Sequence, residues 1–294
     1  MENNRTIVTG YLLAVVSAIA YSAKGIFAKL IYGYGVDPIT LLALRFALAL
    51  PFFWLTFFFY PSGKIRARDG FFLALSGLLG LYAAAIADFY GLLYIDASLE
   101  RIILYTYPAI VVVWSAVFFK EKLGKRKLFS MAFTYAGLAL AIKLFGGGFL
   151  KAHYLGVALV LFSAVIYSLS YIITEVLGRS VSGVKISAYT TTAACFAFLG
   201  TWHGKSFPHE PQVWWLLLIL AVFSTYIPVL ALVLSIKRIG ASRAATVSFI
   251  GPVSTAVLAN IILGETMDLS QIAGMCLVIT GVLVISSEKR VTEG

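Results

Sequence analysis

Charged residues are scarce in this chain of 294 residues. Asp, Glu, Lys and Arg make up 12% of the sequence, whereas hydrophobic residues make up 61% and the mean hydropathy is +0.93. A soluble globular domain has about 25% charged residues. The chain therefore lacks the polar side chains that would cover a soluble protein, and the composition indicates an integral membrane protein.

Reactive and metal-binding side chains are also few. The two cysteines, Cys195 and Cys276, lie inside apolar runs, which excludes a disulfide framework and favours small buried side chains. His153, His203 and His209 lie in or beside short loops, as solvated histidines do, and no nucleotide-binding loop is present. We therefore expect no catalytic residues, no metal and no cofactor, and we predict that the protein is not an enzyme.

Basic residues exceed acidic ones, with a formal net charge of +10. Such a charge could indicate nucleic-acid binding. However, the Lys and Arg residues form short clusters between apolar runs, which is the pattern of cytoplasmic loops in membrane proteins. The expected partners are thus the lipid bilayer and a small-molecule substrate, and not nucleic acid.

Long apolar runs predict ten transmembrane helices. A membrane span needs about 20 apolar residues, and the spans must be helices because an open strand edge in hydrocarbon leaves backbone groups unpaired. The predicted spans are 8–31, 39–59, 70–94, 98–119, 128–146, 154–177, 184–202, 212–235, 241–263 and 270–287. The first is longer than the core of a signal peptide, so we expect it to be retained.

The loops differ sharply in positive charge. One alternate set holds Arg5, Lys64, Arg66, Arg68, Lys120, Lys122, Lys125, Arg126, Lys127, Arg179, Lys185, Lys237, Arg238, Lys289 and Arg290. The other set holds only Lys151 and Lys205. Because positively charged loops stay in the cytoplasm, this predicts a multi-pass protein of the cell inner (plasma) membrane with both termini cytoplasmic.

One stretch of the chain occurs twice. A constant offset of 144 residues relates Ser98 to Ser242, Pro108 to Pro252, Glu121 to Glu265 and Gly137 to Gly281. Such a fixed offset indicates a duplicated unit. It divides the chain into a first five-helix repeat, residues 1–146, and a second, residues 147–294.

The two repeats are predicted to be inverted. A unit of five spans is odd, so the second copy enters the membrane from the opposite side. The basic loop KEKLGKRK at 120–127 accordingly corresponds to GETMDLSQ at 264–271, which has no Lys or Arg. Inverted repeats around a central cavity allow a transporter to expose one site to either side of the membrane alternately.

Particular residues carry a family resemblance. The segment DPITLLALRF at 37–46, the AKLI at 28–31 and the doubled pattern of Ala-Ser, Pro, Glu and Gly resemble the ten-helix EamA-type branch of the drug/metabolite transporter superfamily. The resemblance implies a bundle of ten helices with a central cavity between its halves. It also implies movement of a small metabolite, often outward.

Three ionisable residues stand out most clearly inside predicted spans, where charge is costly and usually functional. Lys24, Arg45 and Asp88 each lie about 10 Å from the outer end of their span, at 1.5 Å per residue. Lys24 or Arg45 could receive a substrate carboxylate, and Asp88 could take up a coupling proton. The alternative is a structural ion pair between Asp88 and one of the bases. We assign Lys24 and Asp88 to substrate binding and Arg45 to a structural or gating role.

The second repeat lacks these charges. Lys24, Arg45 and Asp88 correspond to Ser170, Thr191 and Leu232, and the pair Glu100 and Arg101 corresponds to Ala244 and Ala245. The asymmetry favours a role in substrate orientation or gating over folding alone.

Two repeated pairs are expected to shape the gates. Glu121 and Glu265 end the fourth and ninth spans on opposite membrane faces, where a carboxylate opposes the helix dipole and needs other partners. Pro108 and Pro252 lie within spans and are expected to kink them, either as hinges or for packing. We interpret all four as structural or gating residues.

Tyrosines are the predicted lining of the substrate site, because their rings can stack on solutes or bind cations. The candidates are Tyr21, Tyr82, Tyr105, Tyr167, Tyr171 and Tyr226. Lipid-facing or interfacial packing is the alternative for aromatic residues in general.

The sequence thus predicts a secondary active transporter of small organic metabolites that works by alternating access. An exporter of amino acids or related amphiphilic solutes is favoured, as a monomer or homodimer. An uptake carrier for organic cations or anions is the alternative within transport. A membrane-embedded enzyme or scaffold is the alternative of another class, and it leaves the inverted repeat unexplained.

Overall fold

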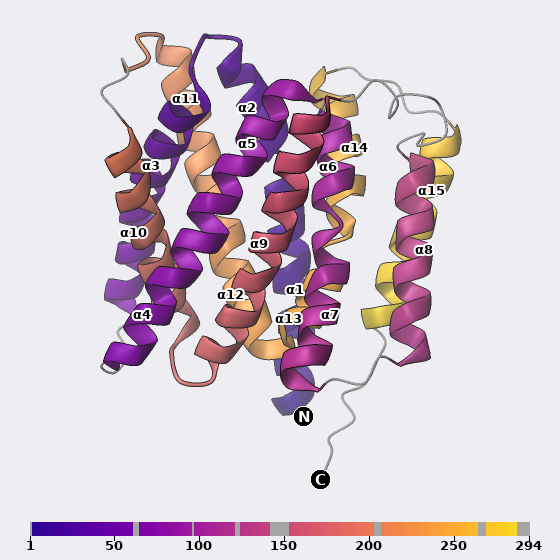
Figure 1. The fold of residues 1–294 in the computed structure, drawn as a ribbon. Coiled ribbons are helices and arrows are strands. Elements are labelled where there is room, and N and C mark those ends of the chain that lie inside the picture. The colour runs from indigo at the N-terminus through magenta and orange to yellow at the C-terminus, as the bar shows by residue number, and fades with distance from the viewer. Residues whose placement is uncertain are drawn as a thin grey trace.

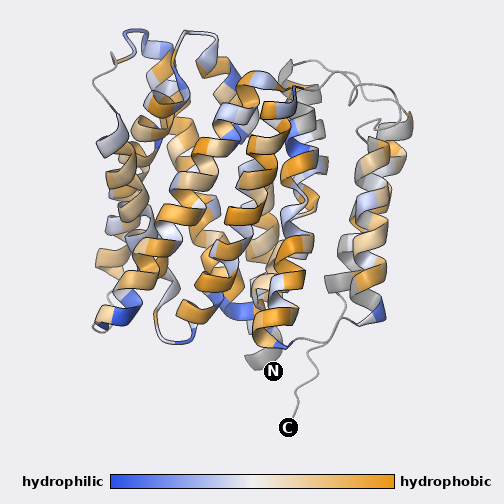
Figure 2. Cartoon of the chain, in the orientation of Figure 1, coloured by the Kyte–Doolittle hydropathy of each residue, from blue (hydrophilic) through white to orange (hydrophobic). Residues whose placement is uncertain are grey.

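The computed structural model describes residues 2–60, 65–95, 97–120, 124–141, 153–202, 207–263 and 269–286. Within these ranges every regular element is a helix, and the helices stand side by side in one bundle (Figure 1). Hydrophobic residues occupy the middle of the bundle and hydrophilic residues gather toward its two ends (Figure 2). Glu121 and Glu265 lie outside the described residues.

The first half of the chain contributes eight α-helices and one π-helical segment. They are α1 (Glu2–Ser22), α2 (Lys24–Tyr32), α3 (Pro38–Phe59), α4 (Ala67–Ser76), η1 (Gly77–Ala83), α5 (Ala84–Tyr94), α6 (Ala97–Leu104), α7 (Tyr107–Phe119) and α8 (Lys125–Ala141). The second half contains α9 (Tyr154–Gly178), α10 (Gly183–Thr201), α11 (Pro211–Ala221), η4 (Val222–Tyr226), α12 (Ile227–Ile239), α13 (Ala241–Val247), α14 (Ile250–Leu263) and α15 (Leu269–Ser286).

Five continuous helices are long and apolar enough to cross a membrane. They are Arg5–Tyr32, Pro38–Phe59, Ala67–Tyr94, Tyr154–Gly178 and Pro211–Ile239. They coincide with five of the spans expected from the sequence. The other five expected spans coincide with α6–α7, α8, α10, α13–α14 and α15. The described residues of these helices are not both long enough and apolar enough to meet the same requirement for a membrane span. The protein is therefore a multi-pass membrane protein, and the count of ten spans stays a prediction.

Irregularities in the helices recur with the repeat. The π-helical segments η1 and η4 begin 145 residues apart (222 − 77), each inside a long apolar helix. The interruption between α6 and α7 likewise corresponds to the one between α13 and α14. In contrast, the interruption at Ala23 between α1 and α2 has no counterpart in α9, which is continuous over 25 residues.

The prolines act differently from the expected kink. Pro108 lies in the first turn of α7, and Pro252 is the third residue of α14. Proline lacks a backbone N–H, so it is tolerated in the first turn of a helix, where that group has no partner within the helix. Each proline therefore follows a break between two helices, and does not bend a continuous one.

Glycines allow the helix α4–η1–α5 to lie very close to its neighbours in the second half. A Cβ atom at Gly77 would come within 2.2 Å of the Thr190 carbonyl oxygen on α10. A Cβ atom at Gly80 would come within 2.4 Å of the Ser170 Oγ on α9. Small residues of this kind let membrane helices approach at the backbone, so the two halves are packed tightly here.

Helices α8 and α15 form a pair at one side of the bundle (Figure 1). Ser130 on α8 donates a hydrogen bond of 2.6 Å to the Gly281 carbonyl oxygen on α15. The helices that surround the centre of the molecule are thus those that precede α8 in the first half and α15 in the second.

Candidate functional site

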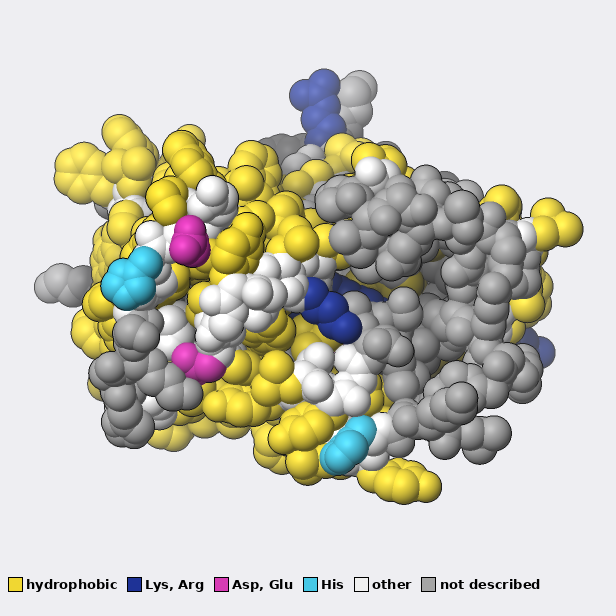
Figure 3. Space-filling model, turned by 90° about the horizontal axis from the view of Figure 1, so that it is seen from above, with side chains coloured by type: hydrophobic (Ala, Val, Ile, Leu, Met, Phe, Trp, Pro, Cys, Tyr) yellow, Lys and Arg dark blue, Asp and Glu magenta, His cyan; other side chains and the backbone are white. Residues whose placement is uncertain are grey.

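A cavity lies between the two halves, with about 80 Å³ available to the centres of water molecules. One water needs about 10–15 Å³ by this measure, so several fit. The lining residues are Tyr21, Lys24, Arg45, Phe46, Gly80, Leu81, Ala84, Ala85, Asp88, Phe89, Arg101, Leu104, Tyr105, Tyr107, Ser163, Tyr167, Thr225 and Val229. Seen from the end of the bundle that is uppermost in Figure 1, the surface is hollowed near its middle, with Lys or Arg side chains in the hollow (Figure 3).

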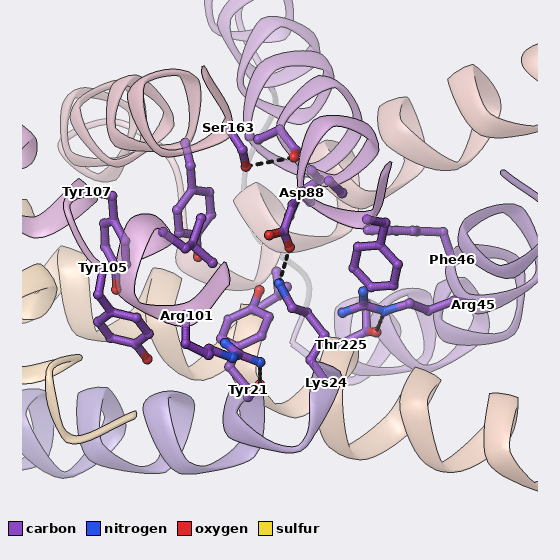
Figure 4. A pocket seen from close by; sticks show the side chains of 18 residues that line it. Tyr21, Lys24, Arg45, Phe46, Asp88, Arg101, Tyr105, Tyr107, Ser163 and Thr225 are labelled. Atoms are coloured by element: carbon purple, nitrogen blue, oxygen red, sulfur yellow. Dashed lines mark hydrogen bonds and ion pairs between the residues drawn. The ribbon is translucent and has the colours of Figure 1, made fainter. Parts of the chain in front are cut away.

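Lys24 and Asp88 form an ion pair across this cavity (Figure 4). Lys24 is the first residue of α2, directly after the break in the first span, and its Nζ binds the Oδ2 of Asp88 on α5. The Nζ also lies 5.3 Å from the centre of the Phe89 ring. The ion pair considered from the sequence is therefore present, and both of its members line the cavity.

Arg45 has a different kind of partner. Its Nε donates a hydrogen bond to the Thr225 hydroxyl, and its Nη2 donates one of 2.6 Å to the Ser224 carbonyl oxygen. Both acceptors lie in η4, where the π-helical backbone departs from the α-helical hydrogen-bond pattern. Among the described residues no carboxylate pairs with Arg45. Its guanidinium therefore brings a positive charge to the cavity that no ion pair neutralises.

Glu100 and Arg101 are two further buried charges, which the sequence analysis did not select as site residues. Arg101 lines the cavity, and its Nη2 donates a hydrogen bond of 3.3 Å to the Tyr21 carbonyl oxygen at the α1–α2 break. The Glu100 Oε2 lies 3.4 Å from the Arg101 Nε. Both residues fall inside the predicted span 98–119, so the criterion that identified Lys24 would also have identified them.

The predicted tyrosines divide into two groups. Tyr21, Tyr105 and Tyr167 line the cavity together with Tyr107, which the sequence analysis did not select. The Tyr107 ring packs edge-on against the Tyr167 ring, with 5.2 Å between their centres. Tyr171 is also buried, and its hydroxyl lies 3.3 Å from the hydroxyl of Tyr107. Ring contacts thus join Tyr105, Tyr107, Tyr167 and Tyr171 into one aromatic cluster.

Tyr82 and Tyr226 do not line the cavity. The Tyr82 ring packs against Phe198 with 4.8 Å between centres, and the Tyr226 ring packs against Phe53 with 5.1 Å between centres. The Tyr226 hydroxyl bonds to that of Thr56. In the described part of the chain both rings hold helices together, because each faces a neighbouring helix and not the centre of the bundle.

A second, smaller cavity of about 30 Å³ adjoins the first. Tyr21, Leu81, Tyr167 and Val229 line both cavities. The second cavity also reaches Ser76, Ser170, Thr174 and Thr190. A wall of four side chains therefore separates two cavities that follow one another through the bundle, and two members of that wall, Tyr21 and Tyr167, are related by the repeat.

The EamA-like transporter family matches this chain twice, over residues 8–143 and 154–287. The chain belongs to this family. The starts of the two matched segments are 146 residues apart (154 − 8), the same offset that relates Lys24 to Ser170. The resemblance noted in the sequence is thus confirmed, while a domain boundary at residues 146 and 147 stays a prediction.

Several relatives in the family are similar along most of their length. The chain is 30% identical over 292 residues to the uncharacterized transporter YcbK of Bacillus subtilis (strain 168), covering 94% of this chain and 93% of the relative. It is 25% identical over 257 residues to the uncharacterized transporter YetK of the same organism, covering 84% and 78%. These relatives are named as transporters, which supports a general transport role.

One crystal structure of a protein supports the fold. It superposes with a TM-score of 0.79, covering 94% of this chain and 96% of that chain at 18% sequence identity. At that identity the likeness shows the fold alone.

Proposed function

We propose that this protein is a secondary active transporter that moves a small organic solute by alternating access. The cavity between the halves would hold the solute, and the wall of Tyr21, Leu81, Tyr167 and Val229 would close it from the second cavity. Because Tyr21 and Tyr167 belong to equivalent helices of the two halves, a rocking motion of one half against the other would separate them. The same motion would connect the solute site to the second cavity.

The charges of the cavity support a solute that carries a carboxylate. Lys24, Arg45 and Arg101 line the cavity, whereas Asp88 is the one acidic residue among its described lining residues. Arg45 carries the argument, because its hydrogen bonds go to the neutral groups of Thr225 and Ser224. A planar guanidinium of this kind can bind a carboxylate through two parallel hydrogen bonds.

The apolar lining supports an amphiphilic solute. Tyr21, Tyr105, Tyr107 and Tyr167 line the same space as the charged groups. Such rings favour flat or apolar side chains, and they bind ammonium groups through cation–π contacts. We therefore favour an amino acid or a related amphiphilic metabolite as the solute.

Export is the direction that we favour, across the cell inner membrane. The basic loops predict cytoplasmic termini, and α1 begins and α15 ends at the lower end of the bundle in Figure 1. The larger cavity would then face outward, and the wall of Tyr21, Leu81, Tyr167 and Val229 would close it on the cytoplasmic side. An uptake carrier for organic ions is the second candidate, supported by the same excess of positive charge.

Efflux from proteoliposomes tests this proposal. Vesicles that contain the purified protein would be loaded with labelled amino acids, amines and organic acids, and efflux would be compared with protein-free vesicles. We expect protein-dependent flux of carboxylate-bearing solutes, reduced by Arg45→Met and unaffected by Arg68→Met, an exposed arginine on α4. Transport of amines alone would reject the substrate class. Absence of flux for the whole pool would reject transport in favour of an enzyme or scaffold.

A further inference from the structure

The carboxyl groups of Asp88 on α5 and Glu100 on α6 belong to one buried cluster with Lys24 and Arg101, and each carboxyl group acts electrostatically on the other. The Asp88 Oδ1 and both carboxyl oxygens of Glu100 are buried and have no hydrogen-bond donor among the described residues. Ionised carboxylates only accept hydrogen bonds. Two neighbouring carboxyl groups can therefore form a hydrogen bond with each other only when one of them carries a proton.

Glu100 is shielded from water. Its exposed fraction is 0%, and it is absent from the lining of both described cavities, whereas Asp88 lines the larger one. Its ion-pair partner, the Arg101 Nε, is 3.4 Å away, which is longer than the about 2.7–2.9 Å of a strong charge-assisted hydrogen bond. A buried carboxylate without good hydrogen bonds is costly, so a protonated Glu100 is the favourable state here.

Charged and titratable groups on several helices act on Asp88 and Glu100. Lys24 on α2 binds the Asp88 Oδ2, and Arg101 lies beside Glu100 on α6. Arg45 on α3, Tyr32 on α2 and Tyr105, just after α6, act on the pair from farther away. With both carboxyl groups ionised, Lys24 and Arg101 balance their charge. With one proton bound to Glu100, the four groups Lys24, Asp88, Glu100 and Arg101 carry one net positive charge. Lys24 still pairs with the remaining Asp88 carboxylate in that state.

We propose that Asp88 and Glu100 share one proton and that this is the proton that couples transport to a gradient. In the loaded state the Glu100 O–H donates to the Asp88 Oδ1. On release, the proton passes to Asp88 and then to water in the cavity, leaving two carboxylates that face Lys24 and Arg101. Glu100 thus stores the proton, and Asp88 relays it.

Coupling follows from the position of Asp88 and rests on the proposed transport function. An ammonium group of an entering solute binds Asp88 in competition with the proton, since Asp88 is the acidic group that the described cavity offers. Solute and proton then occupy the site in turn and move in opposite directions. A coupled carrier of one proton per solute can reach up to about tenfold accumulation for each unit of pH difference.

Infrared spectroscopy of the protein in lipid vesicles tests the shared proton without any solute. We expect the C=O band of a protonated carboxyl group at neutral pH, shifted in D₂O, lost in Glu100→Gln and kept in Glu210→Gln, an exposed glutamate that precedes α11. If Glu100→Gln does not fold, Glu100→Asp replaces it and must shift the band. A band unchanged by substitution at Glu100 overturns the proposal.

Flux under an imposed pH gradient tests the coupling, with labelled amino acids as the probe. We expect Glu100→Gln to lose the pH-driven accumulation of solute, which can reach up to about tenfold for each unit of pH difference in the wild-type protein, while solute exchange continues; Glu210→Gln should keep both. Wild-type flux that ignores the gradient overturns the coupling. If the wild-type protein carries no amino acid at all, the proposed function fails, and the infrared result still decides whether Glu100 holds a proton.

Discussion

Tyr21 and Tyr167 occupy equivalent positions in the two repeats, and both line the larger and the smaller cavity. The repeat thus places two equivalent aromatic side chains between the two cavities. Lys24, three residues after Tyr21, lines only the larger cavity. An element to which both halves contribute equivalent residues, the wall, therefore adjoins an element present in one half alone, the charged cluster.

The wall predicts a change in access when its rings are removed. Tyr21→Ala combined with Tyr167→Ala should join the cavities, so that a cysteine at Ser170 reacts with a thiol reagent added from the side of the larger cavity. The measurement is labelling of Ser170→Cys with Cys195 and Cys276 replaced by serine. Tyr34→Ala, at an exposed ring, is the control and should leave the labelling unchanged. Equal labelling with and without the wall would contradict the assignment.

The ion pair predicts a large loss of stability when one partner is removed. Lys24→Met should destabilise the protein by about 3–5 kcal/mol, because it leaves the buried Asp88 carboxylate without its counter-ion. The double variant Lys24→Met with Asp88→Asn should regain part of that loss, since no charge is then unpaired. Thermal unfolding in detergent, analysed as a double-mutant cycle, checks both. Additive effects of the two substitutions would rule out the pair.

The hydrogen bond between Arg45 and Thr225 predicts a coupled effect on stability and transport. Thr225→Val removes the acceptor of the Arg45 Nε but keeps the shape, at a cost of about 1–3 kcal/mol for the buried donor left unpaired. The freed guanidinium should also raise the KM for carboxylate solutes. Thr201→Val, whose hydroxyl bonds only within α10, is the matched control. An unchanged melting temperature in Thr225→Val would show that this bond contributes nothing.

The close approach of η1 and α10 predicts that Gly77 tolerates no side chain. Gly77→Ala places a Cβ atom 2.2 Å from a backbone oxygen, so one helix must move, at about 1–3 kcal/mol. Gly200→Ala is a matched control on α10, where a Cβ atom meets nothing within 4 Å. There the better helix propensity of alanine should leave stability equal or higher by up to about 1 kcal/mol. Melting temperatures of the two variants should therefore differ in sign, and a similar small change in both would refute the contact.

The helical fold was largely predictable because it depends on composition and local periodicity. Apolar runs place helices where hydrocarbon demands them, and the repeat offset related segments that the structure also relates, including η1 and η4. The breaks near Pro108 and Pro252 were anticipated only as kinks, because proline in the sequence does not show whether the residues before it continue the helix. The break at Ala23 had no such marker.

The candidate site was predictable in part. Lys24, Arg45 and Asp88 stood out because an ionisable side chain inside an apolar run is rare, and all three line the cavity. Tyr82 and Tyr226 were chosen by residue type and helix, and they face neighbouring helices. Which way a ring points depends on the rotation of its helix about its own axis, which the sequence alone does not determine.

The sequence by itself determined that this protein belongs in a membrane, that its chain is a duplicated set of helices and that Lys24, Arg45 and Asp88 have uncharged counterparts in the second repeat. These properties depend on the free energy of transferring each side chain from water to hydrocarbon, which is a property of the residue type and can be read from the sequence. Only the tertiary structure decided that Lys24 binds Asp88, that Arg45 binds neutral groups and that Asp88 and Glu100 belong to one buried cluster. Those relations join residues on different helices, and they exist only once packing has fixed how the helices are rotated and how closely they approach.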